Sequence, residues 1–256
     1  MSSNRAFASE QAIADRLEAA GMGPAEARRK GRSFMQALAG LRELGASAAC
    51  NPYLLYVPGR IEMLGKHTDY AGGRSLLATA ERGFSIVAAA RDDTTARIVD
   101  ATDGSRVSFA LQPELAPEAG HWSNYPMTVA RRIARNFSGP LRGADIAFVS
   151  DLPPAAGMSS SSAMITAMFA VLAHVNGLTQ RAEYAANIGG PEALAGYLAT
   201  IENGQTFGSG LVGSGDIFLC RPIGIETPSS GFTRPGIQPI RLRLPRETNQ
   251  AREYPR

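Results

Sequence analysis

The sequence predicts an α+β fold, and three observations support this. Residues 9–45 carry apolar side chains at helical spacing, with a break at residues 21–24. Short runs typical of β-strands follow at residues 53–57, 85–90 and 96–100. Residues 144–149 form a further strand candidate, which leads through a small, hydroxyl-rich loop into an apolar helix from Ala163. A chain of 256 residues built this way forms one large domain or two small ones.

Proline, glycine and apolar spacing define the remaining segments. The strand at residues 53–57 is expected to end at Pro58-Gly59, and Arg91-Asp92-Asp93 is expected to form a turn. Helical spacing returns at residues 125–133 and 180–203. Prolines crowd the stretch beyond Cys220, where little ordered core is expected. The predicted division is a helical N-terminal extension (1–50), a central domain (51–220) and a poorly patterned Pro/Arg-rich tail (221–256).

Composition argues against several classes of protein. The chain is 44% hydrophobic and 19% charged with a net charge of +3, and its basic excess is scattered, so no nucleic-acid partner is expected. The longest apolar run, residues 163–175, falls short of the ~20 residues that span a bilayer, so no membrane partner is expected. Cys50 and Cys220 cannot form a disulfide framework, and the histidines are too dispersed for zinc. We therefore expect a reduced, cytoplasmic protein without a structural metal.

The loop that precedes Ala163 has a composition suited to phosphate. Residues 151–162 are mostly small and hydroxyl-bearing, which lets backbone N–H groups approach an anion at a helix N-terminus. The alternative is that the serines only cap the helix, and from this loop alone the two interpretations are equally good. Four consecutive serines exceed what one cap requires, and a hydroxyl here could also bind Mg²⁺.

A second polar segment, residues 58–73, superficially resembles a P-loop. Five residues rather than four separate Gly59 from Gly65, and His67 stands where Ser or Thr is required, so that interpretation is rejected. What remains is a turn rich in Arg, Lys, His, Asp and Tyr between two strands. Such a turn could hydrogen-bond a polyol in several directions, or it could be a solvated polar hairpin.

Together the two segments resemble the GHMP kinases (galactokinase, homoserine kinase, mevalonate kinase and phosphomevalonate kinase). Residues 60–73 are similar to the galactokinase signature Gly-Arg-x-x-x-x-Gly-Glu-His-Thr-Asp-Tyr-x-x-Gly, and residues 153–163 to the phosphate loop Pro-x-x-x-Gly-Leu-Ser-Ser-Ser. Residues 121–125 resemble the Trp-x-Asn-Tyr element between them. The resemblance covers residues 52–220. It implies a GHMP-kinase-like N-terminal domain with a mixed sheet packed against helices, and a C-terminal domain largely missing.

The resemblance also implies roles for single residues. Arg60 and Asp216 would be catalytic, Arg60 beside the reacting hydroxyl and Asp216 orienting it. Ser161 and Glu202 would hold Mg²⁺. The residues implied to bind the sugar are Lys66, His67, Asp69 and Tyr70. Those implied to bind the nucleotide are Trp122, Pro154, Ala155, Ala156, Gly157, Met158, Ser159, Ser160 and Ser161.

Each of three implied roles has a plainer alternative. Trp122 could be a core residue, Glu202 an exposed carboxylate at a helix end, and Asp216 a turn residue. Two positions depart from the family pattern. Lys66 replaces the glutamate that contacts the distal hydroxyl of galactose, which favours a sugar with a carboxylate or phosphate there unless the lysine faces solvent. Ile217 stands where Gln or His usually follows the aspartate.

The implied activity is ATP- and Mg²⁺-dependent phosphorylation of a hydroxyl of galactose or of a related sugar or sugar acid. Two alternatives remain: a non-catalytic sugar- or nucleotide-binding relative, and an inactive truncated fragment. Truncation and a shifted reading frame would both explain the loss of pattern after residue 220. The sequence makes no prediction of oligomeric state.

Overall fold

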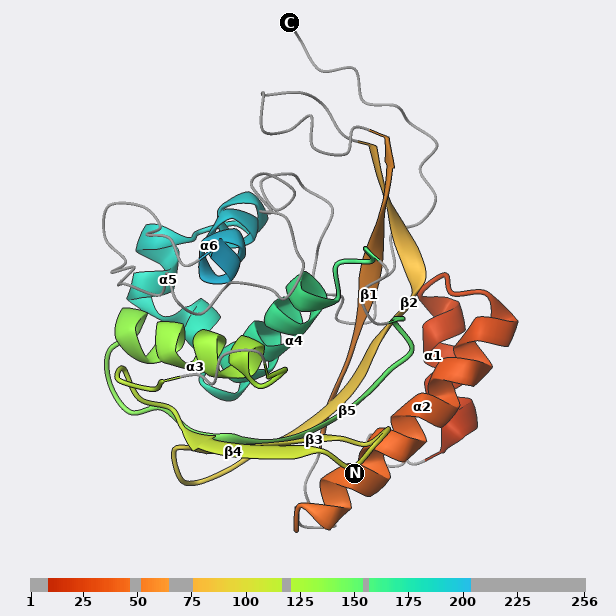
Figure 1. Ribbon diagram of the computed structural model, residues 1–256, viewed down its shortest axis with the longest axis horizontal. Coiled ribbons are helices and arrows are strands. Elements are labelled where there is room, and N and C mark those ends of the chain that lie inside the picture. The colour runs from red at the N-terminus through yellow and green to blue at the C-terminus, as the bar shows by residue number, and fades with distance from the viewer. Residues whose placement is uncertain (1–8, 47–51, 65–75, 117–120, 154–156, 204–256) are drawn as a thin grey trace, which may run out of the picture.

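The computed structural model describes residues 9–46, 52–64, 76–116, 121–153 and 157–203, arranged as helices on both faces of one sheet (Figure 1). The strands are β1 (Tyr53–Leu64), β2 (Leu76–Ala90), β3 (Thr95–Asp100), β4 (Arg106–Ala110) and β5 (Ala144–Ser150). Their order is β1-β2-β5-β3-β4, with β3 and β5 parallel and the other neighbours antiparallel. This confirms the predicted α+β fold with a mixed sheet.

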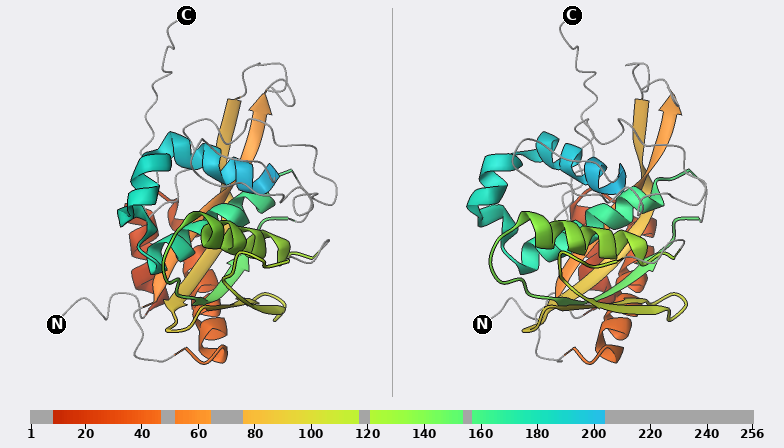
Figure 2. Two further views of the ribbon diagram at one scale, coloured as in Figure 1. Left: turned by 90° about the vertical axis from the view of Figure 1, so that its left-hand side faces the viewer. Right: turned by 60° about the vertical axis from the view of Figure 1, so that its left-hand side comes forward.

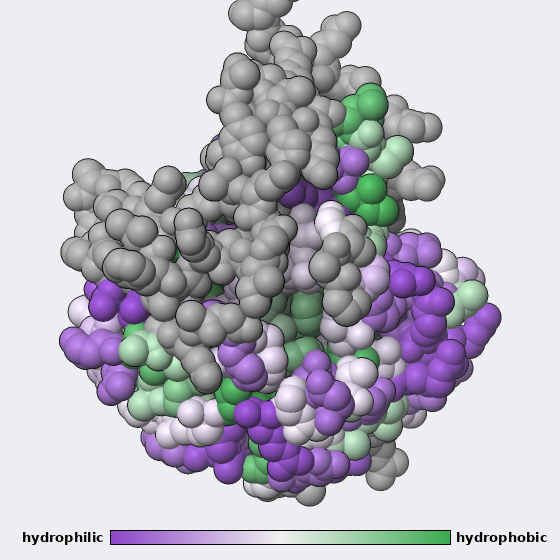
Figure 3. All heavy atoms as spheres, in the orientation of Figure 1, coloured by the Kyte–Doolittle hydropathy of each residue, from purple (hydrophilic) through white to green (hydrophobic). Residues whose placement is uncertain are grey.

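The two N-terminal helices, α1 (Glu10–Ala19) and α2 (Pro24–Glu43), cover one face of the sheet (Figures 1 and 2). Ser9 caps α1 by accepting the Ala12 N–H at 3.2 Å, and Pro24 begins α2 at a position where its missing N–H costs nothing. Both helices lie within the range predicted to be helical. The outer surface over them is mostly hydrophilic in the space-filling view, as expected of amphipathic helices (Figure 3).

The other face is covered by α3 (Asn124–Asn136), α4 (Ser160–Val175), α5 (Ala182–Asn187) and α6 (Pro191–Asn203), with a short 3₁₀ turn at Leu178–Gln180. Helix α4 is apolar nearly all round because the sheet, α3 and α6 surround it. Successive side chains of β5 point to opposite faces of the sheet and so enter two separate hydrophobic cores. Ile146 and Phe148 pack under α4, whereas Ala147 and Val149 pack under α2.

The strand prediction was wrong at Pro58-Gly59, where β1 continues to Leu64 across a register irregularity between Pro58 and Arg60. A proline is tolerated there because β1 is the outer strand of the sheet and needs partners on one side only. Strand β2 correspondingly begins at Leu76, well before the predicted residue 85. Arg60 therefore lies in a strand rather than in the predicted polar turn, and residues 65–75 lie outside the described residues.

Three smaller differences concern element boundaries. Strand β4 was not predicted, and α4 begins at Ser160 rather than at Ala163. The single helix predicted over residues 180–203 is interrupted at residues 188–190, where Gly189 has φ 65°. In the part of the chain that the structure describes, no helix is both long and apolar enough to cross a membrane.

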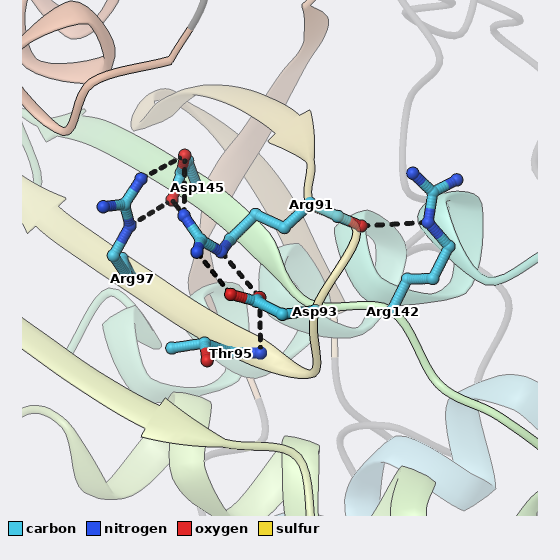
Figure 4. A network of polar contacts seen from close by, with 6 residues as sticks. All are labelled: Arg91, Asp93, Thr95, Arg97, Arg142 and Asp145. Atoms are coloured by element: carbon cyan, nitrogen blue, oxygen red, sulfur yellow. Dashed lines mark hydrogen bonds and ion pairs between the residues drawn. The ribbon is translucent and has the colours of Figure 1, made fainter.

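A network of charges ties the sheet together at the end of β5 away from the serine-rich loop (Figure 4). Asp145 is 5% exposed and accepts hydrogen bonds from Arg97 Nε at 2.6 Å and Arg91 Nη1 at 3.1 Å. Arg91 also pairs with Asp93, and its carbonyl oxygen accepts from Arg142 Nε at 2.9 Å. These contacts join β3 and β5 to the turn that follows β2, so the network is structural and lies away from the serine-rich loop.

Candidate functional site

The serine-rich loop enters α4 through two residues in the left-handed region. Gly157 has φ 68° and Ser159 has φ 54°. Among the described residues, Ser159 is the only non-glycine residue with a positive φ. A left-handed serine costs roughly 1–2 kcal/mol, so the surrounding structure must impose it. The Ser159 side chain makes no capping hydrogen bond. The capping interpretation of this serine therefore fails, and a helix N-terminus without a side-chain cap suits an anion.

Two serines in the first turn of α4 contact the buried carboxylate of Glu202, which lies near the C-terminal end of α6. Ser161 Oγ donates to Glu202 Oε1 and Ser162 Oγ to Glu202 Oε2, each at 2.7 Å. Ser161 and Glu202 are each 3% exposed. Burial raises the pKa of the Glu202 carboxyl above its ordinary value, and the hydrogen bonds from Ser161 and Ser162 act in the opposite direction. The alternative of an exposed helix-end carboxylate was wrong.

Arg60 provides positive charge beside this carboxylate. Its guanidinium acts on Glu202 to lower the pKa of that carboxyl. Arg60 Nε and Nη1 are buried and find no hydrogen-bond partner among the described residues. Buried donors are nearly always paired in native proteins, so these two nitrogens are candidates for contact with an anion or a polar ligand.

The loop also lies close against β1. The Arg60 N–H donates to the Met158 carbonyl oxygen at 3.1 Å. A Cβ on Gly59 would lie 2.5 Å from Leu152 Cδ2 and 2.9 Å from the Met158 carbonyl oxygen, so a side chain at this position would force the loop away. The strand thus brings Arg60 and the loop together through backbone contact.

The oxygen atoms of Ser161 and Glu202 suit Mg²⁺. Hydroxyl and carboxylate oxygens are the donors that this ion prefers, and it is usually held by one or two carboxylates together with substrate phosphates. No cluster of three or more His, Cys, Asp or Glu side chains occurs within the described ranges, so an all-protein cage is not formed there. One carboxylate beside a candidate phosphate loop fits a site in which substrate phosphates supply the remaining ligands of Mg²⁺.

Trp122 lies against the sheet core. Its ring meets the Phe148 ring edge-on with the centroids 5.6 Å apart, and the centroid of the His121 ring also lies 5.6 Å away. Its Nε1 atom is buried without a hydrogen-bond partner among the described residues. The ring is only partly buried, so core packing does not account for all of its surface.

The structure brings together Arg60, Ser161 and Glu202 with the described part of the loop, residues 157–160. Sequence reasoning missed the role of Ser162 in the carboxylate contact, although the run of four serines hinted at it. The other predicted site residues lie outside the described residues: Lys66, His67, Asp69, Tyr70, Pro154, Ala155, Ala156 and Asp216.

Two family models match the chain. Residues 45–91 match the galactokinase galactose-binding signature, and residues 124–201 match the N-terminal domain of the GHMP kinases. The first match contains Arg60, and the second contains the serine-rich loop and α4 but ends just before Glu202.

Curated galactokinases align with part of the chain. That of Glaesserella parasuis is 33% identical over 110 residues, which are 43% of this chain and 29% of the relative. That of Chloroflexus aurantiacus is 35% identical over 123 residues, which are 46% of this chain and 31% of the relative. The chain thus spans less than a third of the length of these relatives.

A solved structure shows the same fold. The galactokinase of Lactococcus lactis, crystallised with galactose, superposes with a TM-score of 0.56 at 21% identity. The match covers 69% of this chain and 44% of that one. The sheet and its helical layers therefore have the architecture found in that enzyme.

Proposed function

We propose that this chain, which matches the N-terminal domain of the GHMP kinases over residues 124–201, takes part in phosphorylating a sugar hydroxyl with ATP. The galactokinase galactose-binding signature at residues 45–91 supports a sugar as the acceptor. The curated relatives, which are named galactokinases, support the same class of reaction.

The observation that carries the proposal is the hydrogen bond of 2.7 Å between Ser161 Oγ and Glu202 Oε1. It joins the first turn of α4 to a carboxylate that is 3% exposed, beside a helix start that Ser159 does not cap. Burying a carboxylate is costly unless its charge is compensated. Two serine hydroxyls and the charge of Arg60 compensate part of it, and a cation bound with ATP would compensate the rest.

The nucleotide is assigned to the loop and to α4. Backbone N–H groups of residues 157–160 would bind the phosphates, and Ser161 with Glu202 would hold Mg²⁺. When bound, Mg²⁺ neutralises charge on the phosphate oxygens. Trp122 would flank the adenine with the part of its ring that the core leaves uncovered. Pro154, Ala155 and Ala156 complete the proposed loop.

Arg60 is assigned to the transferring phosphoryl group. Its buried and unpaired Nε and Nη1 atoms can donate to phosphoryl oxygens as charge develops on them, without having to give up other partners first. Phosphoryl transfer needs little covalent help from a protein, so positioning and charge neutralisation would supply most of the rate.

The sugar is assigned to the segment that follows Arg60. His67 and Asp69 would hold sugar hydroxyls, with Tyr70 beside them, and Asp216 would orient the attacking hydroxyl. Lys66 is a cation where the galactokinase signature has glutamate, which favours an acidic sugar over galactose.

ADP formation in the presence of a panel of neutral and acidic hexoses tests the proposal, with Mg²⁺ or EDTA present. The expected result is sugar-dependent ADP formation that needs Mg²⁺. Calorimetric titration of ADP and of each sugar runs in parallel. Binding of both ligands without turnover would make the chain a non-catalytic binding protein. A protein that unfolds cooperatively but binds no nucleotide would overturn the nucleotide assignment.

A further inference from the structure

Lys30 lies in α2, outside both segments that match family models, yet its ammonium group reaches the start of the serine-rich loop. Lys30 Nζ donates to Asp151 Oδ2 at 2.5 Å, and Asp151 is the first residue after β5. The lysine is 1% exposed, whereas lysines are almost never fully buried unless they are paired. Its place in the structure therefore needs an explanation beyond helix amphipathicity.

The buried ammonium has other partners besides Asp151. Glu26 Oε1 lies 3.2 Å from Nζ, and the ring of Tyr56 lies 5.2 Å from it. A buried ion pair is weak evidence for stability, because apolar residues of similar volume often serve as well. What the directional contact from Lys30 can add is a fixed position for the Asp151 carboxylate.

Asp151 in turn is hydrogen-bonded to the sheet. Its Oδ1 atom accepts the Gly83 N–H at 2.8 Å, and its own N–H donates to the Gly83 carbonyl oxygen at 3.3 Å. A Cβ on Gly83 would lie 2.3 Å from the Val57 carbonyl oxygen, so β1 and β2 are packed tightly at this point. Asp151 is thus held by α2 on one carboxylate oxygen and by β2 on the other.

Hydrogen bonds therefore hold the serine-rich loop at two places, Asp151 and Met158. The start is held by Lys30 through Asp151, and the far end is held by the hydrogen bond from the Arg60 N–H to Met158. Between these points Leu152 is buried against Gly59. Only the first of these ties depends on a side chain from the N-terminal helices.

We propose that Lys30 is a positioning residue for the phosphate loop. Through Asp151 it fixes where the chain leaves β5, and so where the N–H groups of residues 157–160 stand. The inference rests on the proposed function, because it takes those N–H groups to bind phosphate. It extends the nucleotide site to the helical layer on the opposite face of the sheet.

The test uses Lys30→Met, which keeps the length of the side chain and removes its charge. The matched control is Leu41→Ala in the same helix, buried at 3% exposure and about 16 Å further along at 1.5 Å per residue. Lys30→Met/Asp151→Asn removes both charges and keeps the test valid if the single variant folds poorly. Each protein is measured in two ways: by calorimetric titration with ADP, and by hydrogen exchange of backbone amides at residues 157–162 without ligand.

Lys30→Met is expected to weaken ADP binding about tenfold and to speed exchange at residues 157–162 about fivefold or more. Leu41→Ala is expected to lower the unfolding temperature while changing both readouts less than about twofold. The double variant should be no worse than Lys30→Met, since the pair acts as a unit. Equal effects of Lys30→Met and Leu41→Ala on loop exchange would overturn the inference. If the unaltered protein binds no ADP, the proposed function falls, and loop exchange alone decides the role of Lys30.

Discussion

The hydroxyl of Ser162 donates to Glu202 Oε2 at 2.7 Å, beside the equal hydrogen bond that the same carboxylate accepts from Ser161. Adjacent serines on α4 therefore occupy both oxygens of one buried group. Only Ser161 is assigned to the metal, so the two serines give a matched pair for testing that assignment.

Ser161→Ala is expected to weaken Mg²⁺-ATP binding about tenfold and Mg²⁺-free nucleotide binding much less, because it removes a metal ligand rather than a phosphate contact. Ser162→Ala removes a hydroxyl from the same carboxylate and should show no such difference. Calorimetric titration with ATP in Mg²⁺ and in EDTA measures both variants. An equal loss with and without Mg²⁺ in Ser161→Ala would rule out the metal role.

Arg60→Met is expected to lower the rate of phosphoryl transfer by about 100-fold or more, since it removes charge placed for the transition state. The same variant removes two donors, Nε and Nη1, that are buried without partners among the described residues, but it also removes the positive charge that acts on buried Glu202, so the unfolding temperature should change little. Thermal unfolding and ADP formation measure the two effects. A variant that loses both activity and stability would indicate a structural role instead.

The pKa of Asp93 lies well below its ordinary value of 3.8, chiefly because Arg91 donates a side-chain hydrogen bond to it. The folded protein then binds fewer protons here than the unfolded chain does, so this carboxylate stabilises the fold above pH 3.8 and loses its effect as the pH falls below that value. Asp93→Asn should reduce stability at about pH 7 and flatten its fall below about pH 4.

Urea unfolding at several pH values measures that slope. The control is Asp92→Asn, which makes the same change of charge one residue away at an exposed pair with Arg142. A pH profile altered equally by both substitutions would show that net charge, rather than the contact with Arg91, is responsible.

Lys66→Glu is expected to reverse a preference for galacturonate over galactose. If Lys66 faces the sugar, a carboxylate there gains a charge-assisted hydrogen bond of ~1.5–3 kcal/mol, or roughly ten- to a hundredfold in affinity. The new glutamate would repel the acid and accept from the neutral hydroxyl. Calorimetric titration of both sugars into both proteins measures the preference, and a preference unchanged by the substitution would place Lys66 toward solvent.

Local patterns predicted most elements, and they failed where tertiary context overrides them. The strands around Ile86, Ile98 and Ile146 were predicted because apolar runs are typical of buried strands. Pro58 misled the prediction because proline usually ends a strand, whereas the outer place of β1 makes it harmless. Strand β4 was missed because it is only five residues long, although Arg106–Ala110 does alternate polar and apolar side chains.

The site was predictable in type but not in its contacts. The serine run and the family resemblance indicated the loop, and Ser161 and Glu202 were predicted together from that resemblance. The burial of Glu202 could not be predicted, because a helix-end carboxylate is usually exposed and its partners lie some forty residues away. The pairing of Lys30 with Asp151 was equally hidden, since the two are 121 residues apart.

The helical layer of α1 and α2 has a practical consequence for shortening this chain. A version that begins at residue 45, where the first family match begins, would lose both helices. The sheet face that they cover carries Tyr56, Val87 and Val149, all buried in the intact chain. Uncovered, this face would be an apolar patch of the kind that drives self-association. Such a version is therefore expected to self-associate as the protein concentration rises.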